Sequence, residues 1–265
     1  MIKKRLYAMP CYKIMIAMGV VDVLNLCSNA LLAGYYSIIG RNYCENDKVM
    51  PIIGAVALGM WGAYCAFCIL LACNRSIDLC SSQLSAKLFD GKRLFLWFLF
   101  PILYGAFFAS PLQPKVGYSA DFGVWFIMGN SIVHSINNFL TCTLLFTIYI
   151  WLIYLLWKNT RTNSSHGVSN LQKQVIVQCF FICSLTMAAC ISYIVIQVAS
   201  VPPEFYKLSQ FSWQACHGGN AIIYLTLNRT IRKTVGRFFR SYRIPSVTVS
   251  DVPQVPQLQN YLHRP

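Results

Sequence analysis

Long uninterrupted runs of apolar residues dominate the chain, and their spacing is typical of a polytopic membrane protein. A helix needs about 20 apolar residues to cross a hydrocarbon core about 30 Å thick. Six runs reach that length: Ile14 to Ile39, Met50 to Cys73, Leu94 to Leu112, Val124 to Trp157, Val175 to Val201 and Leu208 to Asn228. The pattern predicts an all-α bundle with six transmembrane spans.

The residues after the last run predict a short helix followed by an irregular tail. Between about 229 and 243, apolar residues recur at helical spacing with Arg and Lys between them, as in helices that lie in the membrane interface. Such a helix either anchors the chain to lipid or takes part in coupling. From 244 to 265, prolines and few large apolar groups predict a disordered cytoplasmic tail. We therefore expect one bundle domain, residues 1–243, and a tail, residues 244–265.

Composition and charge support a membrane protein and predict its orientation. The chain is 56% hydrophobic and 11% charged, whereas about a quarter of the residues of a soluble domain are charged. Eighteen of the 22 Lys and Arg residues fall in the leading segment, in alternate loops and in the tail. Because basic loops stay in the cytoplasm, both termini are predicted to be cytoplasmic. The net charge of +14 on this face suits anionic lipid headgroups rather than nucleic acid.

Asp22 lies in the middle of the first predicted span, where an unpaired acid costs at least about 2.5 to 3.5 kcal/mol. Either it is a polar residue that packs between helices, or it belongs to a conformational switch or an ion and water site. Asn220 in the last span is the best candidate partner. The run from Asn220 to Tyr224 resembles the NPxxY motif of rhodopsin-like receptors, with Ala221 replacing the proline.

Two further segments carry the same resemblance. Asn74 and Arg75, in the run CNRS, are similar to the DRY motif at the end of the third helix of those receptors, and LNRTIRKTVGRFF resembles their short eighth helix. Arg75 either extends to lipid headgroups or lies at the mouth of a cavity that receives a G protein. Asp78 is a candidate substitute for the missing acid of the motif.

A closer likeness covers most of the chain. MPCYKIMIAMGVVD, IIGRNYC, LLACNRSIDL, LFDGKR, HSINN and HGGNAIIYLTLNRTIR are similar to recurrent segments of the nematode serpentine receptors of class T. The resemblance implies a chemosensory G-protein-coupled receptor in the plasma membrane, including that of sensory cilia, with a heterotrimeric G protein as partner and a small-molecule or peptide ligand. It implies a switch network of Asp22, Asn220 and Tyr224, and G-protein coupling through Arg75 and Asn74.

The chain departs from that family in its number of spans. Family members begin with one more span, so six spans with both ends inside are what the seven-helix fold without helix one predicts. Two other functions stay open: a small transporter or channel, and a truncated receptor product that does not signal. Internal repeats and broken spans, which are typical of transporters, are absent from the sequence.

A ligand pocket is expected between the helices at the outer side, lined by aromatic residues with a few polar groups. The candidates by placement are Trp61, Tyr64, His134, Asn138, Gln197, Trp213 and His217. Each of them is also a residue type that packs or hydrogen-bonds between helices.

The sequence offers no enzyme motif and predicts no cofactor. His134 with Asn137 and Asn138 is a poor donor set for zinc or iron, so we predict no metal site. Eleven of the twelve cysteines fall in predicted spans or on the cytoplasmic side, and the partner of Cys44 cannot be assigned.

Overall fold

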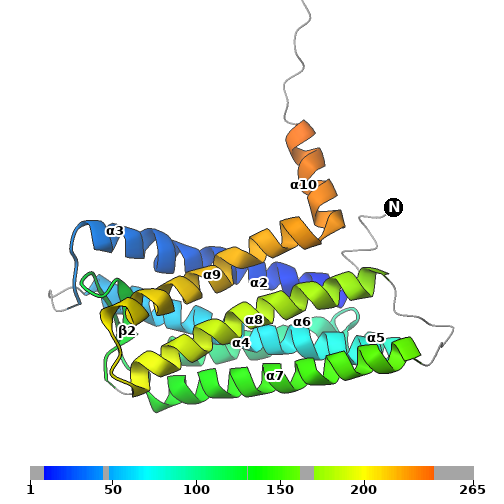
Figure 1. The fold of residues 1–265 in the computed structure, drawn as a ribbon, viewed down its shortest axis with the longest axis horizontal. Coiled ribbons are helices and arrows are strands. Elements are labelled where there is room, and N and C mark those ends of the chain that lie inside the picture. Colours follow the sequence, from blue (N-terminus) through cyan, green and yellow to red (C-terminus); the bar gives the residue numbers. More distant parts are fainter. Residues whose placement is uncertain (1–8, 44–47, 130, 162–169, 242–265) are drawn as a thin grey trace, which may run out of the picture. The chain divides into compact units, whose positions relative to one another are not determined.

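Long helices lie side by side in the computed structural model, with a β-hairpin at one end of the bundle (Figure 1). The structure describes residues 9–43, 48–129, 131–161 and 170–241. The elements are α2 (Pro10–Leu26), η1 (Cys27–Leu32), α3 (Ala33–Ile38), α4 (Val49–Cys80), α5 (Ser82–Phe89), α6 (Arg93–Phe108), β1 (Val116–Ser119), β2 (Val124–Ile127), α7 (Ile132–Arg161), α8 (Asn170–Val198), α9 (Pro203–Leu227) and α10 (Arg229–Ser241). Below, the hairpin end is the end that carries β1 and β2, and the Arg75 end is the opposite one.

The first predicted span is one helical rod, α2–η1–α3, with a wider π turn in its middle. In η1 the amide of Ala33 donates to the carbonyl of Ser28, five residues back instead of four. The carbonyl of Asn29, which this amide would use in a regular α-helix, accepts the side-chain amides of Gln210 and Gln214 from α9. The π turn therefore joins the first rod to the last helix of the bundle.

Helix α4 is the central helix of the bundle. Of the residues in its most apolar 18-residue stretch, 72% are buried, against 28 to 39% in the other candidate spans. It packs against α2, α6, α7 and α8. Small residues bring α4 and α6 together: a Cβ at Gly59 would lie 2.8 Å from the carbonyl oxygen of Gly105, and one at Gly105 would lie 2.8 Å from that of Gly59. Such close contacts of small residues are typical of helices packed within membranes.

The hairpin corrects the start of the fourth predicted span. The fold is otherwise helical, as predicted, but residues 124–127 are not the first turns of a span. Val124–Ile127 is instead a strand that pairs with Val116–Ser119, with Val116 opposite Ile127, and α7 begins at Ile132. Gly123, with φ at +63°, takes the left-handed conformation in the connecting turn. The loop after α3 extends this sheet, because the amide of Tyr43 donates to the carbonyl of Tyr118.

Four helical segments of the described residues are long and apolar enough to cross a membrane, and a bent pair makes a fifth. The four are Pro10–Ile38, Val49–Cys80, Ile132–Lys158 and Lys173–Val198, and the pair, bent by 68°, is Ser82–Phe89 with Arg93–Phe108. Helix α9 has the length of a span but carries too many polar residues for the same criterion. The six-span count therefore stays a prediction.

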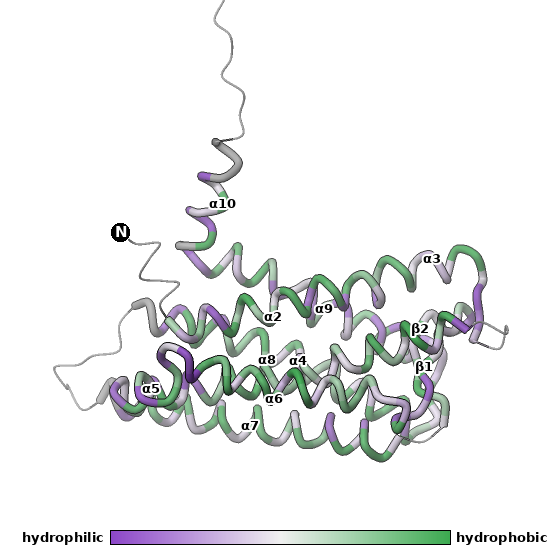
Figure 2. The backbone as a smooth tube through the Cα atoms, turned by 180° about the vertical axis from the view of Figure 1, so that it is seen from behind, coloured by the Kyte–Doolittle hydropathy of each residue, from purple (hydrophilic) through white to green (hydrophobic). Residues whose placement is uncertain are grey.

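Figure 2 shows hydrophobic residues along the lengths of the bundle helices and hydrophilic ones at the α5–α6 turn and around the hairpin. Large apolar side chains of α6 and α7 are exposed, among them Leu96 at 71% and Phe139 at 65%. Such a surface is unfavourable in water and suits lipid.

Helix α10 belongs to a separate unit that starts at Arg229. Its sequence alternates apolar and basic residues at helical spacing, and the structure gives it helical form over Arg229–Ser241. The predicted disordered tail, residues 244–265, and Cys44 lie outside the described residues.

Candidate functional site

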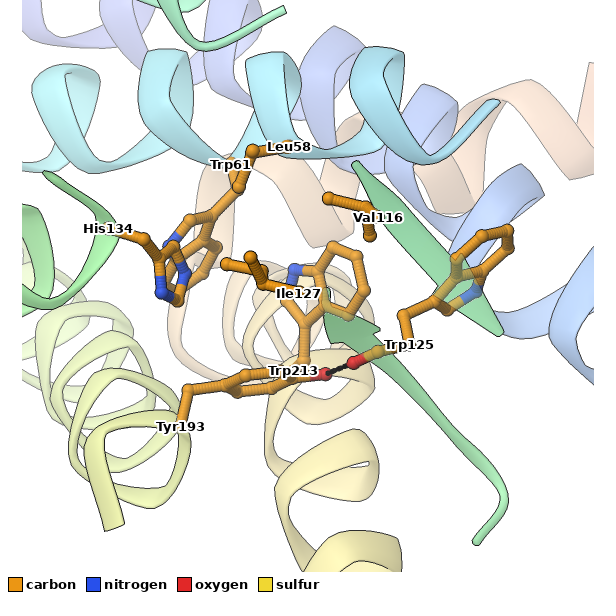
Figure 3. Close-up of a pocket in the computed structure, with 8 residues that line it drawn as sticks. All are labelled: Leu58, Trp61, Val116, Trp125, Ile127, His134, Tyr193 and Trp213. Carbon is orange, nitrogen blue, oxygen red and sulfur yellow. Dashed lines mark hydrogen bonds between the residues drawn. The ribbon is translucent and has the colours of Figure 1, made fainter. Parts of the chain in front are cut away.

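A small cavity of about 30 Å³, partly open to solvent, lies among the helices beneath the hairpin. Figure 3 shows the residues that line it, which come from α4, β1, β2, α7, α8 and α9: Leu58, Trp61, Val116, Trp125, Ile127, His134, Tyr193 and Trp213. Most of this wall is aromatic, and the structure places no Lys, Arg, Asp or Glu among the lining residues. We call it the aromatic cavity.

A second cavity, of about 370 Å³, lies beside it between the hairpin, α8 and α9. Ile127 and Tyr193 line both cavities. Its lining contains more polar groups, including Ser119 and Gln197.

A chain of hydrogen bonds fixes one wall of the aromatic cavity. Trp61 Nε1 donates to Asn138 Oδ1 over 3.0 Å, and Asn138 Nδ2 lies 3.4 Å from His134 Nε2. The other ring nitrogen of His134 lies 3.0 Å from Gln197 Nε2, and Gln197 Oε1 accepts from Ser135. An imidazolium, which has two donors and no acceptor, would therefore face two amide nitrogens. A neutral His134 can accept from one of the two amides, so it fits this arrangement better than an imidazolium does.

The opposite wall is formed by the hairpin, which is held down by Trp125. The indole of Trp125 is buried, and its Nε1 donates to the carbonyl of Ser28 in η1 over 3.3 Å. Its backbone amide donates to Gln210 Oε1, and its carbonyl accepts from the hydroxyl of Tyr193. Trp125 thus connects the hairpin to the first rod, to α8 and to α9.

The indole of Trp213 lies between the other side chains that line the aromatic cavity (Figure 3). Its side chain is 6% exposed, and its Nε1 is buried without a hydrogen-bond partner in the described part of the chain. In Figure 3 this nitrogen is on the edge of the indole that looks toward Trp61 and His134. A buried donor without a partner is rare in folded proteins and calls for an explanation.

A second polar cluster, the Asp22 network, lies deeper in the bundle. Asp22 accepts from His217 Nδ1 over 2.7 Å and from Asn220 Nδ2 over 2.8 Å. Asn220 Nδ2 also donates to the hydroxyl of Tyr64, and Asn25 Nδ2 lies 2.9 Å from His217 Nε2. These contacts fit a neutral imidazole that is protonated on Nδ1 and accepts at Nε2. The carboxylate is thus solvated by protein donors rather than left bare in an apolar region.

The aromatic cavity and the Asp22 network touch each other through rings that pack edge to face. The centroid of the His217 ring lies 6.4 Å from that of Trp213 and 6.1 Å from that of Trp61, both of which line the cavity. It lies 4.5 Å from the ring of Tyr64. Trp213 and His217 are one turn apart on α9, so a displacement of the Trp213 ring would also move the His217 ring that packs against it.

Polar contacts also close the Arg75 end. Arg75, 4% exposed, forms an ion pair with Asp78 at 3.4 Å and donates to Asn74 Oδ1 at 2.5 Å. Asn228, after α9, donates to the hydroxyl of Tyr12 on α2 and to Gln178 Oε1 on α8, both over 3.3 Å. The ends of α2, α8 and α9 are therefore tied together. Arg75 does not reach outward to headgroups in this conformation.

The predicted site residues separate into groups. Trp61, His134 and Trp213 line the aromatic cavity, and Asn138 and Gln197 hold His134 in place. Tyr64 and His217 contact Asp22 or Asn220 rather than the cavity. Of the three predicted switch residues, Asp22 and Asn220 are bonded, while the buried hydroxyl of Tyr224 has no partner among the described residues.

Sequence reasoning missed Trp125, Tyr193, Gln210 and Asn25. Asn25 lies one turn after Asp22, a spacing that places both on the same helix face and could have identified it. Trp125 had been counted as part of a span, which concealed its position in a strand. Among the described residues, no group of three or more His, Cys, Asp or Glu side chains is arranged to hold a metal ion.

Comparison with known proteins agrees with this architecture. The sequence model of the family described as "Serpentine type 7TM GPCR chemoreceptor Srt" matches residues 1–246. Serpentine receptor class T-55 of Caenorhabditis elegans is 26% identical over 236 residues, which are 85% of this chain and 64% of that protein. The chain thus spans less than two thirds of the length of that relative. Together with the apolar helices, the family match identifies a multi-pass membrane protein, and this chain belongs to the Srt family of serpentine seven-transmembrane chemoreceptors.

Proposed function

We propose that this chain is a chemosensory receptor that binds a small external molecule in the aromatic cavity and signals to a heterotrimeric G protein at the Arg75 end. The hairpin end then faces outward and the Arg75 end faces the cytoplasm, in the plasma membrane. The distribution of Lys and Arg supports this orientation, with eighteen on the proposed inner side and four on the outer. Helix α10 then lies along the inner interface, with its basic residues toward anionic lipid.

The observation that carries the proposal is the ring contact between the cavity and the Asp22 network. Trp213 lines the cavity, and His217, one turn on, bonds to Asp22 and lies against Tyr64. A ligand that moves Trp213 therefore acts on a carboxylate that joins α2 to α9. Buried polar networks of this kind hold one helix arrangement until a member is displaced.

Signalling then follows from a shift between two packings of the bundle. The conformation described above is the resting one, since Asn228 ties the ends of α2, α8 and α9 and Arg75 is bonded to Asp78. Moving the equilibrium from 1:99 to 99:1 requires about 5.5 kcal/mol of differential ligand binding. Opening of the Arg75 end would expose the surface that a G protein contacts.

The test is G-protein activation in cells that express the protein with a G-protein dissociation reporter, screened against pools of small organic molecules. Asp22→Asn should change the stimulated response at equal surface expression, because the substituted amide cannot accept two strong donors as the carboxylate does. Ser212→Ala is the matched control, since that hydroxyl donates to the carbonyl of Leu208 within α9. An unchanged response of Asp22→Asn would refute the role of the network.

The same preparation separates the receptor from the transporter or channel reading. If reconstituted vesicles show solute flux while no G-protein response is found, the receptor proposal fails. If a response is found without flux, the transporter reading fails.

A further inference from the structure

Nearly every polar group of the aromatic cavity already has a partner within the protein. The donors of Trp61 and Trp125 are bonded to Asn138 Oδ1 and to the carbonyl of Ser28. The hydroxyl of Tyr193 donates toward the carbonyl of Trp125 and Gln210 Oε1. The exception among the lining residues is Trp213, whose indole N–H has none in the described chain. A ligand is therefore offered one free donor.

The acceptors near the cavity are occupied in the same way. Asn138 Oδ1 already accepts from both Trp61 and Asn137, and Gln197 Oε1 accepts from Ser135. Both ring nitrogens of His134 face side-chain amides. A ligand hydroxyl or amine would lose its hydrogen bonds to water on entry and find few acceptors in exchange, which is costly for a buried donor.

Charge and shape restrict the ligand further, and because the cavity has a volume of only about 30 Å³, Trp213 and its neighbours must move apart to admit one. The cavity presents no Asp, Glu, Lys or Arg, so neither an ammonium nor a carboxylate would find a counter-ion there. The indoles of Trp61 and Trp213, with the rings of Tyr193 and His134, make flat walls that suit an apolar or aromatic skeleton. Amino acids, peptides and biogenic amines are poor fits to such a site.

We propose that the ligand is a neutral, compact organic molecule whose polar group is a hydrogen-bond acceptor alone, such as a ketone, aldehyde, ester or ring nitrogen, and that Trp213 Nε1 donates to it. The inference rests on the proposed function in taking the aromatic cavity as the ligand site. It goes further in naming the chemical class and the atom that recognises it. Trp213 is then both the recognising residue and the contact to His217.

The experiment measures binding directly and does not require a G protein. The purified protein in lipid nanodiscs is equilibrated with matched triads, each a ketone, the corresponding secondary alcohol and the hydrocarbon of the same skeleton. Acetophenone, its reduced alcohol and ethylbenzene form one triad, and other triads vary the skeleton. Bound probe is measured by equilibrium dialysis, and empty nanodiscs give the partition into lipid.

The wild type is compared with two variants. The wild type should bind the ketone of at least one triad about tenfold more tightly than its alcohol and its hydrocarbon. The hydrocarbon offers the buried N–H no acceptor, and the alcohol accepts this bond only by leaving its own O–H without a partner. Trp213→Phe keeps an aromatic ring without the N–H, so it should abolish the tenfold preference for the ketone over the hydrocarbon of the same skeleton. Trp151→Phe, which alters an exposed ring on α7, should leave this preference unchanged.

Three results would overturn the inference: alcohols or amines that bind more tightly than ketones, a ketone preference that survives Trp213→Phe, or no binding of any triad member. The proposed function fails separately. Ketone binding with the expected preference but without G-protein activation would support the ligand class and refute the receptor role. Activation by a charged molecule or a peptide would support the receptor role and refute the ligand class.

Discussion

His217 Nδ1 lies 2.7 Å from Asp22 Oδ1, so the last helix of the bundle supplies a principal hydrogen-bond donor to the carboxylate of the first rod. The other donor to this carboxylate is Asn220, from the same helix. Because α9 supplies both donors, the α2–α9 interface depends on them. The pairing also explains how an acidic residue is accommodated in the middle of an apolar span.

His217→Leu should destabilise the folded protein by about 3 kcal/mol, since it leaves Asp22 buried with a single donor. The measurement is the thermal unfolding midpoint of the purified protein in detergent. Asp22→Asn added to His217→Leu should recover part of the loss, because the neutral amide costs less to bury than the carboxylate. A double variant no more stable than the single one would contradict this account of the network.

Asn228→Ala should raise G-protein signalling in the absence of ligand. The substitution removes the bonds to Tyr12 and Gln178 that tie α2 and α8 to the end of α9. A loss of about 1 kcal/mol from the closed state would raise the ratio of open to closed protein about fivefold. The reporter assay without added ligand measures this, at surface expression matched to the wild type. Basal signalling equal to that of the wild type would show that the tie does not restrain opening.

Gly59→Ala should impair folding, while Gly19→Ala should be tolerated. A Cβ at Gly59 would lie 2.7 Å from Ala109 Cβ and 2.8 Å from the carbonyl oxygen of Gly105, so α4 and α6 would have to separate. At Gly19 nothing lies within 4 Å of the added Cβ, and alanine favours the helix. The yield of monodisperse protein after detergent extraction compares the two, and equal yields would indicate that the α4–α6 contact adapts.

The sequence predicted the helices well where hydropathy alone identifies them. It did less well where the assignment depends on whether polar side chains point toward other helices or toward lipid. The runs that became α4, α7 and α8 are apolar all round, so a window that ignores direction finds them. Helix α9 carries Gln210, His217 and Asn220 on a face that bonds inward, and such a window counts them as if they met lipid. The hairpin was missed because a short apolar run such as Val124–Ile127 does not distinguish a strand from a helix.

The candidate site was predicted in part for a related reason. The position of an acid inside an apolar run gave Asp22, motif likeness gave Asn220, and placement by depth gave Trp61, His134 and Trp213. The depth of a residue in the membrane does not tell in which direction its side chain points from the helix. Tyr64 and His217 therefore turned out to bond to the Asp22 network, although their depth had suggested the cavity.

The π turn at Cys27–Leu32 has a consequence for how the chain tolerates insertions and deletions. A turn of this kind holds one residue more than a regular one, so it shifts the phase of the helix by about 100°. Residues before it, including Asp22, and residues after it, including Tyr36, can then both face inward on one rod. Deleting a single residue here would therefore restore an ordinary helix whose two halves keep their facing, and the cost would be that the carbonyl of Asn29 returns to a backbone amide and is lost to Gln210 and Gln214.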